Sequence, residues 1–104
     1  MKIVEVNEDH ILFDNGSEIT FNYIRECYED NYADFNQIDT IARATNFNEN
    51  LDFRECDFGF RFGNYPERMF FVPCYSVQNG YYSSEIDIYF NNQRVLCADA
   101  EIIN

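Results

Sequence analysis

The first 24 residues alternate between apolar and polar positions in the way that β-strands do. Ile19, Phe21 and Tyr23 are separated by polar residues, so a strand there would present one apolar face and one polar face. Asn15-Gly16 lies between two such segments, and this dipeptide readily adopts the positive φ angles of a tight hairpin turn. The pattern predicts strands over residues 3–6, 11–13 and 18–24, with a turn at 7–9.

The apolar period changes to that of a helix after residue 33. Four apolar residues recur at intervals of three and four positions: Phe35, Ile38, Ile41 and Ala42. Asp34 and Gln37 stand three positions apart, as in a capping box, where side chains bond the free N–H groups at the start of a helix. We expect one helix over about 34–44, stabilised by packing because an isolated helix of this length is marginal.

Strand periodicity returns from residue 51 onward. The apolar run 69–72 is typical of a central strand covered on both faces, and Pro73 is expected to end that strand or to introduce a bulge. The order of strands, one helix and more strands predicts a single α+β domain over residues 1–104, with a mainly antiparallel sheet. The remaining expected elements are turns at 64–66, 79–80 and 91–93 and strands at 85–90 and 94–103.

The chain carries 19 Asp and Glu against 7 Lys and Arg, a formal net charge of −12. Disordered acidic tails are poor in aromatic residues, whereas this chain has 11 Phe and 8 Tyr, so we expect the acids on the surface of a folded domain. Such a surface repels nucleic-acid phosphates and anionic lipids, which argues against direct binding to nucleic acid or membrane. Basic proteins are the expected partners. A surface built for solubility is the alternative, and homo-oligomer formation stays open.

Residues with catalytic or metal-binding chemistry form no recognisable motif. His10 is the only histidine, and the four cysteines (Cys27, Cys56, Cys74 and Cys97) lack the paired spacing of a zinc site. We therefore expect no enzyme activity, no cofactor and no metal. The cysteines are interpreted as buried thiols of a reducing cytoplasm, with two disulfides or a zinc site as alternatives. The chain begins without an apolar leader and has no long apolar run, so we expect a cytoplasmic protein.

Residues 26–39 concentrate five carboxylates with no basic residue among them. Acidic side chains steer association with basic surfaces, and interleaved tyrosines anchor interfaces. The segment predicts a surface that docks on the basic groove of a nucleic-acid-binding protein and that imitates a nucleic-acid duplex if the acids share one face. The alternatives are a solvated loop with acids at a helix N-terminus, or a calcium site, although the EF-hand pattern is missing. The predicted partner-binding residues are Glu26, Tyr28, Glu29, Asp30, Tyr32, Asp34 and Asp39.

A second segment, 54–82, places arginines among aromatic residues. An aromatic ring can stack on a nucleotide base while a guanidinium group binds its phosphate, so the segment predicts a small-ligand site for a nucleotide signal. The alternative is that the arginines pair with the abundant carboxylates and that the aromatics form the core. The predicted ligand-binding residues are Arg61, Tyr65, Arg68 and Tyr81.

Two stretches together resemble an uncharacterised family of small acidic proteins from bacteria and their phages. The first covers residues 26–35, ECYEDNYADF, and the second runs from FRFGN through MFFVPCYS to QNGYYSS, so that the resemblance spans most of the chain. Relatives often have two adjacent cysteines in the first motif, where this chain has Tyr28 after Cys27. The family has no activity that can be carried over to this chain. The phage context that the resemblance implies favours a non-enzymatic inhibitor of host defence in the host cytoplasm, similar to anti-CRISPR proteins, or a protein that sequesters a nucleotide signal.

Overall fold

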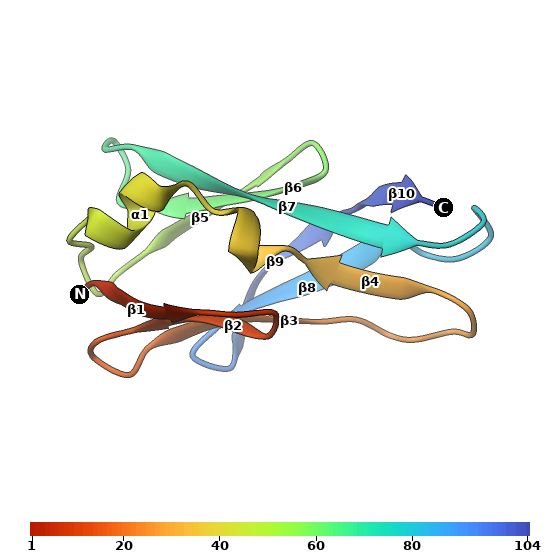
Figure 1. Ribbon diagram of the computed structural model, residues 1–104, viewed down its shortest axis with the longest axis horizontal. Helices are drawn as coiled ribbons and strands as arrows, with labels where there is room; N and C mark the ends of the chain where they lie inside the picture. Colours follow the sequence, from red (N-terminus) through yellow and green to blue (C-terminus); the bar gives the residue numbers. More distant parts are fainter.

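The chain forms ten strands, one short α-helix and one turn of 3-10 helix, and the computed structural model describes all 104 residues (Figure 1). The strands are β1 (Ile3–Val6), β2 (His10–Phe13), β3 (Glu18–Asn22), β4 (Asp30–Ala33), β5 (Asp52–Cys56), β6 (Gly59–Gly63), β7 (Met69–Val77), β8 (Glu85–Phe90), β9 (Gln93–Asp99) and β10 (Glu101–Ile103). The 3-10 turn η1 (Phe35–Gln37) and helix α1 (Thr40–Ala44) lie between β4 and β5.

Two sheets enclose one core (Figure 1). The first sheet has the strand order β1-β2-β3-β8-β9, and the second has the order β10-β7-β6-β5, with β4 also paired to β7. Every pair is antiparallel except β10 with β7, which run parallel. The prediction of an α+β fold with mainly antiparallel strands is confirmed.

Tight turns connect the strands of the first sheet where the sequence predicted them. Gly16 has a φ of 87° in the turn between β2 and β3. Asn91 and Asn92 both have positive φ between β8 and β9, as a two-residue hairpin requires. The Asn91 side chain also accepts a hydrogen bond from the Glu18 N–H, which ties this turn to the start of β3.

Phenylalanine rings join the two sheets. Phe13 from the first sheet makes edge-to-face contacts with Phe62 from the second, with Phe47 after α1, and with Phe90 at the end of β8. Centroid separations of 5.9–6.5 Å are those at which the positive ring edge meets the negative ring face. Alternate residues of β2, β3, β6, β7 and β8 supply much of the rest of the core, so in these strands the period-two pattern of the sequence is also the burial pattern. Phe35, Ile38, Ala42 and Phe47, between β4 and β5, add to it.

The prediction of one short helix is confirmed, but α1 covers only Thr40–Ala44 of the expected 34–44, because the chain is extended after the 3-10 turn. Ile38 has ψ of 141°, which ends η1, and Asp39 begins α1 by accepting a hydrogen bond from the Ile41 N–H. Asp34 and Gln37 bond each other through their side chains at 2.7 Å rather than capping the backbone.

No helix of the protein has the length and apolar character needed to span a membrane.

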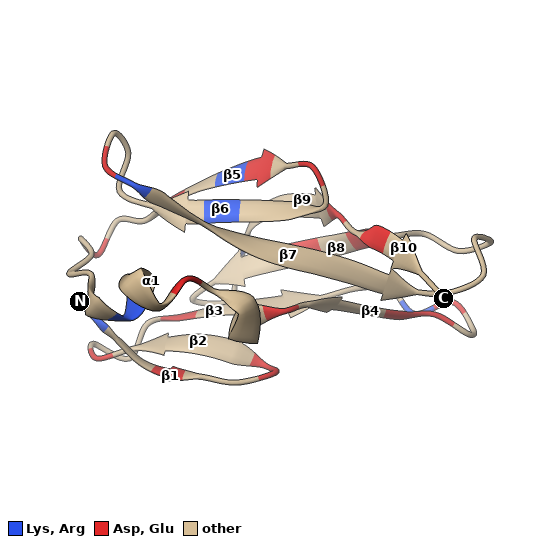
Figure 2. Ribbon diagram, turned by 45° about the horizontal axis from the view of Figure 1, so that its top comes forward, with Lys and Arg blue, Asp and Glu red and all other residues tan.

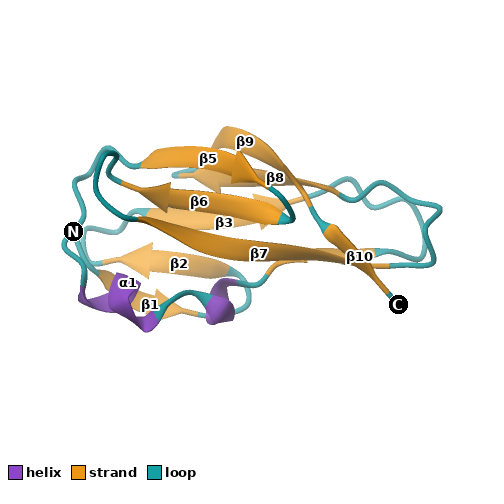
Figure 3. Ribbon diagram, turned by 90° about the horizontal axis from the view of Figure 1, so that it is seen from above, coloured by secondary structure: helices purple, strands orange, loops and turns teal.

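Pro73 neither ends nor bulges its strand, which corrects the expectation for 69–72. β7 pairs with β6 as far as Pro73 and with β4 from Cys74 onward, so the proline stands where the pairing changes from β6 to β4 (Figure 1). Figure 3 shows β6 along the first part of β7 and β10 beside its end. The Pro73 carbonyl accepts a hydrogen bond from the Asp34 N–H at 2.8 Å. β7 is also covered on one face only, since Phe71 is half-exposed against Gly59 on the outer face.

Two other strand boundaries differ from the expected ones. The third strand ends at Asn22, and the segment 94–103 divides into two strands. β9 pairs with β8 in the first sheet, whereas β10 crosses over and pairs with the end of β7 in the second. Ala100 marks the crossing, where its N–H donates to the Ser84 carbonyl.

The four cysteines are unpaired thiols in different environments. Cys74 is buried, Cys56 and Cys97 are half-buried, and Cys27 is exposed, so the expectation of four buried thiols holds fully for Cys74 alone and is wrong for Cys27. Histidine, cysteine and carboxylate side chains nowhere gather as a group of three that could hold a metal ion.

We expect Phe13→Ala to lower the free energy of unfolding by about 3–5 kcal/mol, because it removes a ring from the contact between the sheets and leaves a cavity. Urea denaturation measures the change. Tyr81→Ala is the control, since this ring is exposed and its loss should change stability by less than about 0.5 kcal/mol. Equal effects of the two substitutions would contradict the assignment of Phe13 to the core.

Alkaline pH should destabilise the protein through Cys74. Burial raises the pKa of this thiol from 9.0 to about 12, and Cys56 adds to the shift. Below pH 9.0 the thiol is protonated in both states; above it, only the unfolded chain loses the proton, so stability falls by up to about 1.4 kcal/mol per pH unit.

We expect Cys74→Ala to flatten the slope of unfolding free energy against pH above about pH 9, measured by urea denaturation at each pH. Cys27→Ala, which alters an exposed thiol, should keep the native slope. An unchanged slope in Cys74→Ala would show that this thiol titrates alike in the folded and unfolded states.

Candidate functional site

A cleft of about 580 Å³ opens between the turn that joins β1 and β2, the end of β3, and β4. Four carboxylates and three aromatic rings line it, and no lysine or arginine does. We call it the acidic cleft. Its lining residues are Glu8, Asp9, Phe21, Tyr23, Asp30, Asn31, Tyr32, Ala33, Asp34 and Asn36.

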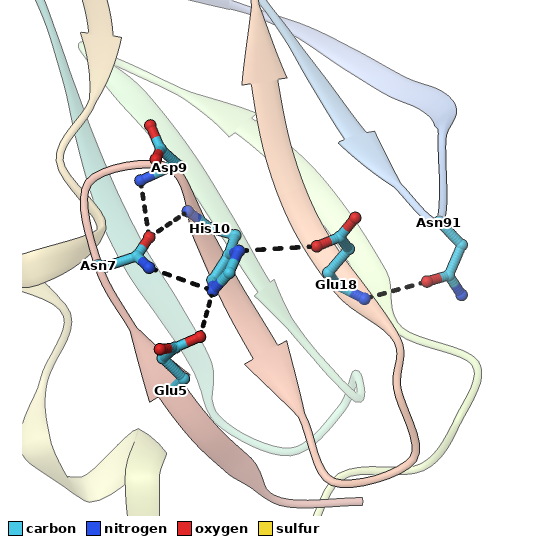
Figure 4. Close-up of polar contacts among 6 residues, drawn as sticks. All are labelled: Glu5, Asn7, Asp9, His10, Glu18 and Asn91. Atoms are coloured by element: carbon cyan, nitrogen blue, oxygen red, sulfur yellow. Dashed lines mark hydrogen bonds and ion pairs between the residues drawn. The ribbon is translucent and has the colours of Figure 1, made fainter.

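One wall of the acidic cleft is the β1–β2 turn, whose shape depends on Asn7 (Figure 4). The Asn7 side-chain oxygen accepts hydrogen bonds from the N–H groups of Asp9 at 2.8 Å and His10 at 3.0 Å. Asparagine commonly stabilises turns in this way, by bonding the backbone two residues ahead. The bonds hold Glu8 and Asp9 at the rim of the cleft.

His10 secures this turn from the outer face of the first sheet (Figure 4). Its Nε2 lies 2.7 Å from a carboxylate oxygen of Glu5, and its Nδ1 lies 3.7 Å from one of Glu18. An imidazole between two carboxylates links β1, β2 and β3 through their side chains. His10 does not line the cleft, so its part is to position the turn.

β4 forms the opposite wall, and a buried polar network holds it in place. The Ser76 hydroxyl donates to the Asn31 side-chain oxygen, and the Asn31 side-chain amide donates to the Ser83 carbonyl at 3.0 Å. Gln78 donates in turn to the Ser76 hydroxyl at 2.6 Å. These bonds fasten β4 to β7 and to the loop after it, so the wall is rigid beneath its exposed acids.

Tyr32 lies between Asp30 and Asp34 along the chain, and its ring packs against that of Tyr75 with centroids 5.6 Å apart and planes tilted by 43°. Burial raises the pKa of the Tyr32 phenol, and the negative charge of Asp34, then of Tyr75 and Asp30, raises it further. The phenol therefore stays neutral at physiological pH. An aromatic ring face beside unneutralised carboxylates is suited to a cation.

Glu29 does not belong to the exposed acidic surface, which corrects its predicted role. The residue is only 1% exposed. Both of its carboxylate oxygens accept from the Glu26 N–H at 3.0 Å, and one accepts from the Cys27 N–H at 3.0 Å. The side chain therefore closes the loop before β4 from within.

The other residues of the predicted partner-binding set lie in three places. Asp30, Tyr32 and Asp34 line the acidic cleft. Glu26 and Tyr28 lie in the loop between β3 and β4, where Tyr28 is 82% exposed. Asp39 caps α1 and forms an ion pair with Arg68 at 2.6 Å, so its charge is neutralised.

Sequence reasoning missed Glu8 and Asp9, which complete the cleft. They stand in a segment that it treated as a turn, about 20 residues before β4. Two adjacent acids in the β1–β2 turn are the signal that could have found them. This turn leads into β2, which pairs with β3, the strand that contains Phe21.

The predicted nucleotide-binding residues do not come together. Arg61 lies over the ring of Phe71 on the outer face of the second sheet, and Arg68 is paired with Asp39. Tyr65 follows β6, whereas Tyr81 lies in the loop that follows β7, at the opposite end of the molecule (Figure 1).

The alternative expectation, in which the arginines of segment 54–82 pair with carboxylates, holds in part. Arg68 pairs with a carboxylate, but Arg54 and Arg61 form no ion pair. Their guanidinium groups lie instead over Tyr65 at 4.3 Å and Phe71 at 5.4 Å from the ring centroids.

A second acidic hollow, of about 600 Å³, lies at the β5–β6 turn beside β8 and β9. It also has four carboxylates, from Glu55, Asp57, Glu85 and Asp99, but only one aromatic residue, Phe58. It shares the charge of the acidic cleft without its three aromatic rings.

No protein-family model matches the chain, and neither the curated proteins nor the solved structures with which it was compared contain a match. The function is therefore argued from the geometry of the acidic cleft.

We expect Glu29→Gln to lower the free energy of unfolding by about 1–3 kcal/mol, because an amide N–H₂ would face backbone N–H donors that the carboxylate now satisfies. Glu101→Gln, at an exposed position of β10, is the charge-matched control and should change stability little. Urea denaturation compares the two. Equal stabilities would mean that the Glu29 hydrogen bonds contribute nothing to folding.

Proposed function

We propose that this protein is a non-enzymatic interaction protein that binds a basic protein partner through the acidic cleft. The observation that supports this proposal is that four carboxylates and three aromatic rings, and no basic residue, line one cleft. None of the four carboxylates takes part in an ion pair. Each keeps a charge that a lysine or arginine of a partner could neutralise.

Cation recognition follows from the two kinds of lining residue. Tyr23 and Tyr32 line the cleft; aromatic rings attract a desolvated ammonium or guanidinium group, and carboxylates supply charge-assisted hydrogen bonds to it. The net charge of −12 steers a basic partner toward the protein over a range set by the Debye length, about 8 Å at physiological salt.

The distribution of charge favours local docking over imitation of a duplex. Asp and Glu occur on both sheets and in loops at both ends of the molecule (Figure 2). The five acids of 26–39 do not form one continuous face, because Glu29 is buried and Asp39 is paired. A basic segment that enters the acidic cleft needs no such face.

Nucleic-acid-binding proteins carry the exposed lysines and arginines that this cleft would accept. An inhibitor that occupies the nucleic-acid-binding groove of a host defence protein, in the cytoplasm, is the form of this function that the family resemblance implies. The protein would then compete with nucleic acid for the partner and would not bind nucleic acid itself.

Two variants with the same net charge test this proposal. Glu8→Gln, Asp9→Asn, Asp30→Asn and Asp34→Asn together neutralise the acidic cleft; Glu55→Gln, Asp57→Asn, Glu85→Gln and Asp99→Asn neutralise the second hollow. Each set changes the net charge from −12 to −8, by removing four negative charges.

We expect the cleft variant to bind a fluorescent oligolysine peptide at least about tenfold more weakly than the native protein, measured by fluorescence anisotropy. The control variant should lose no more than about threefold, and the native affinity should fall as salt is added. Circular dichroism verifies that both variants fold. If both variants lost affinity equally, binding would depend on net charge alone and the cleft would have no specific part.

A further inference from the structure

No helix or strand lies over the outer face of the second sheet in the view from above, where β5, β6, β7 and β10 are open to solvent (Figure 3). η1 lies at its border, where Gln37 donates a hydrogen bond to the Tyr75 hydroxyl. The outward-facing residues of β7 form an apolar stripe, about 26 Å long at about 3.3 Å per residue. We call this the β7 stripe; its members are Met69, Phe71, Pro73, Tyr75 and Val77.

The β7 stripe reads alike from both ends. Pro73, which is buried, is its centre. The partly exposed rings of Phe71 and Tyr75 stand two residues to either side of it, and Met69 and Val77 stand four residues to either side. Two sheets pack face to face with their strands nearly aligned, and a two-fold interface requires a surface that is complementary to itself. A two-fold axis that crosses β7 at Pro73 would satisfy this requirement.

Charged residues beside the stripe follow the same symmetry with opposite signs. Arg61 of β6 lies opposite Phe71, and Glu101 of β10 lies opposite Tyr75, so both belong to the outer face. Both are exposed, and neither forms an ion pair. Figure 2 shows the basic segment of β6 and the acidic segment of β10 toward opposite ends of β7.

β6 and β10 follow one another along the same edge of β7. The Cys74 N–H donates to the Phe58 carbonyl just before β6, and the Gln78 N–H donates to the Ile103 carbonyl in β10. Extended residues four positions apart direct their N–H groups to the same edge. A half-turn about the axis across β7 therefore lays the β6 side of one copy over the β10 side of the other.

We propose that two copies of this chain form a two-fold dimer through the outer face of the second sheet, with Arg61 of each copy paired to Glu101 of the other. Phe71 of each copy packs against Tyr75 of the other. The contact gives Arg61 a carboxylate, which it lacks in the monomer, where Arg54 stands directly opposite it. The inference is independent of the proposed function, since neither Arg61 nor Glu101 lines the acidic cleft.

The dimer should be weak. The molecule measures 40 by 20 Å in the view of Figure 3, and only part of this footprint belongs to the outer face. Interfaces of standard size bury about 800 Å² per partner, so this one lies toward the small end, and we expect a dissociation constant of about micromolar order. The net charge of −12 opposes association, but physiological salt screens this repulsion beyond about 8 Å.

Sedimentation equilibrium at physiological salt, over protein concentrations of about 1–300 µM, tests the dimer. Arg61→Glu and Glu101→Arg each place like charges together in both symmetric contacts. We expect each substitution to raise the dissociation constant of the dimer at least about tenfold. Circular dichroism verifies that the variants fold.

Exchange of the two charges is the matched control. A chain that carries both Arg61→Glu and Glu101→Arg forms the same ion pairs with reversed polarity, and its net charge stays at −12 because the two changes cancel. An equimolar mixture of the two single variants also forms both ion pairs, between unlike chains. We expect the double variant and the mixture to dimerise within about threefold of the native protein.

Each other outcome overturns the dimer. A native protein that stays monomeric over the whole concentration range would show that the face does not self-associate. A native dimer that either single substitution leaves unweakened would use another surface. Weakening by both single substitutions without recovery in the double variant and in the mixture would mean that positions 61 and 101 do not face each other. Oligolysine binding is measured separately, so the proposed function stands or fails without regard to these results.

Discussion

The exchange of neighbours along β7 is the constraint on which the rest of the structure depends. Its first half completes the antiparallel sheet with β6, and its second half holds β4 on one side and β10 in parallel. β7 is the only strand that pairs with β4, and the loop after β7 holds β4 as well, through the bond from Asn31 to the Ser83 carbonyl. Pro73 has no N–H to donate. The sheet tolerates this because β4 ends beside the proline, so only one hydrogen bond is lost, and the Pro73 carbonyl still accepts from the Asp34 N–H.

The protein spreads its acids over strands and loops alike and pairs few of them with basic residues. Only two arginine–carboxylate ion pairs form, although 19 acids are present. Arg54 and Arg61 stand directly opposite each other and stack on aromatic rings instead. Like charges in such a cross-strand pair repel, and contact with ring faces offsets part of that repulsion.

Period-two alternation was enough to predict most strands, because one face of each sheet is buried. The expected helix was too long because its core residues come from three places: Phe35 from η1, Ile38 from the extended link of two residues, and Ala42 from α1. Their spacing is one that a single helix would also produce. For the candidate site, the sequence identified the acids of β4 but not Glu8 and Asp9, which only the packing of the β1–β2 turn brings opposite. The burial of Glu29 depends on three backbone contacts that no pattern in the sequence reveals.

The strand order of the first sheet also bears on how the protein is made. β3 pairs with β8, so the sheet cannot be completed until Phe90, which lies opposite Ile19, has been synthesised. Contacts so far apart in sequence slow folding, because a long loop must be closed before they stabilise anything. On the ribosome, the first three strands would emerge as a meander. The edge of β3 that later pairs with β8 would have no partner until nearly the whole chain had been synthesised. Charged and polar residues along β3, among them Glu18, Thr20 and Asn22, then help to keep the nascent chain from associating with its neighbours.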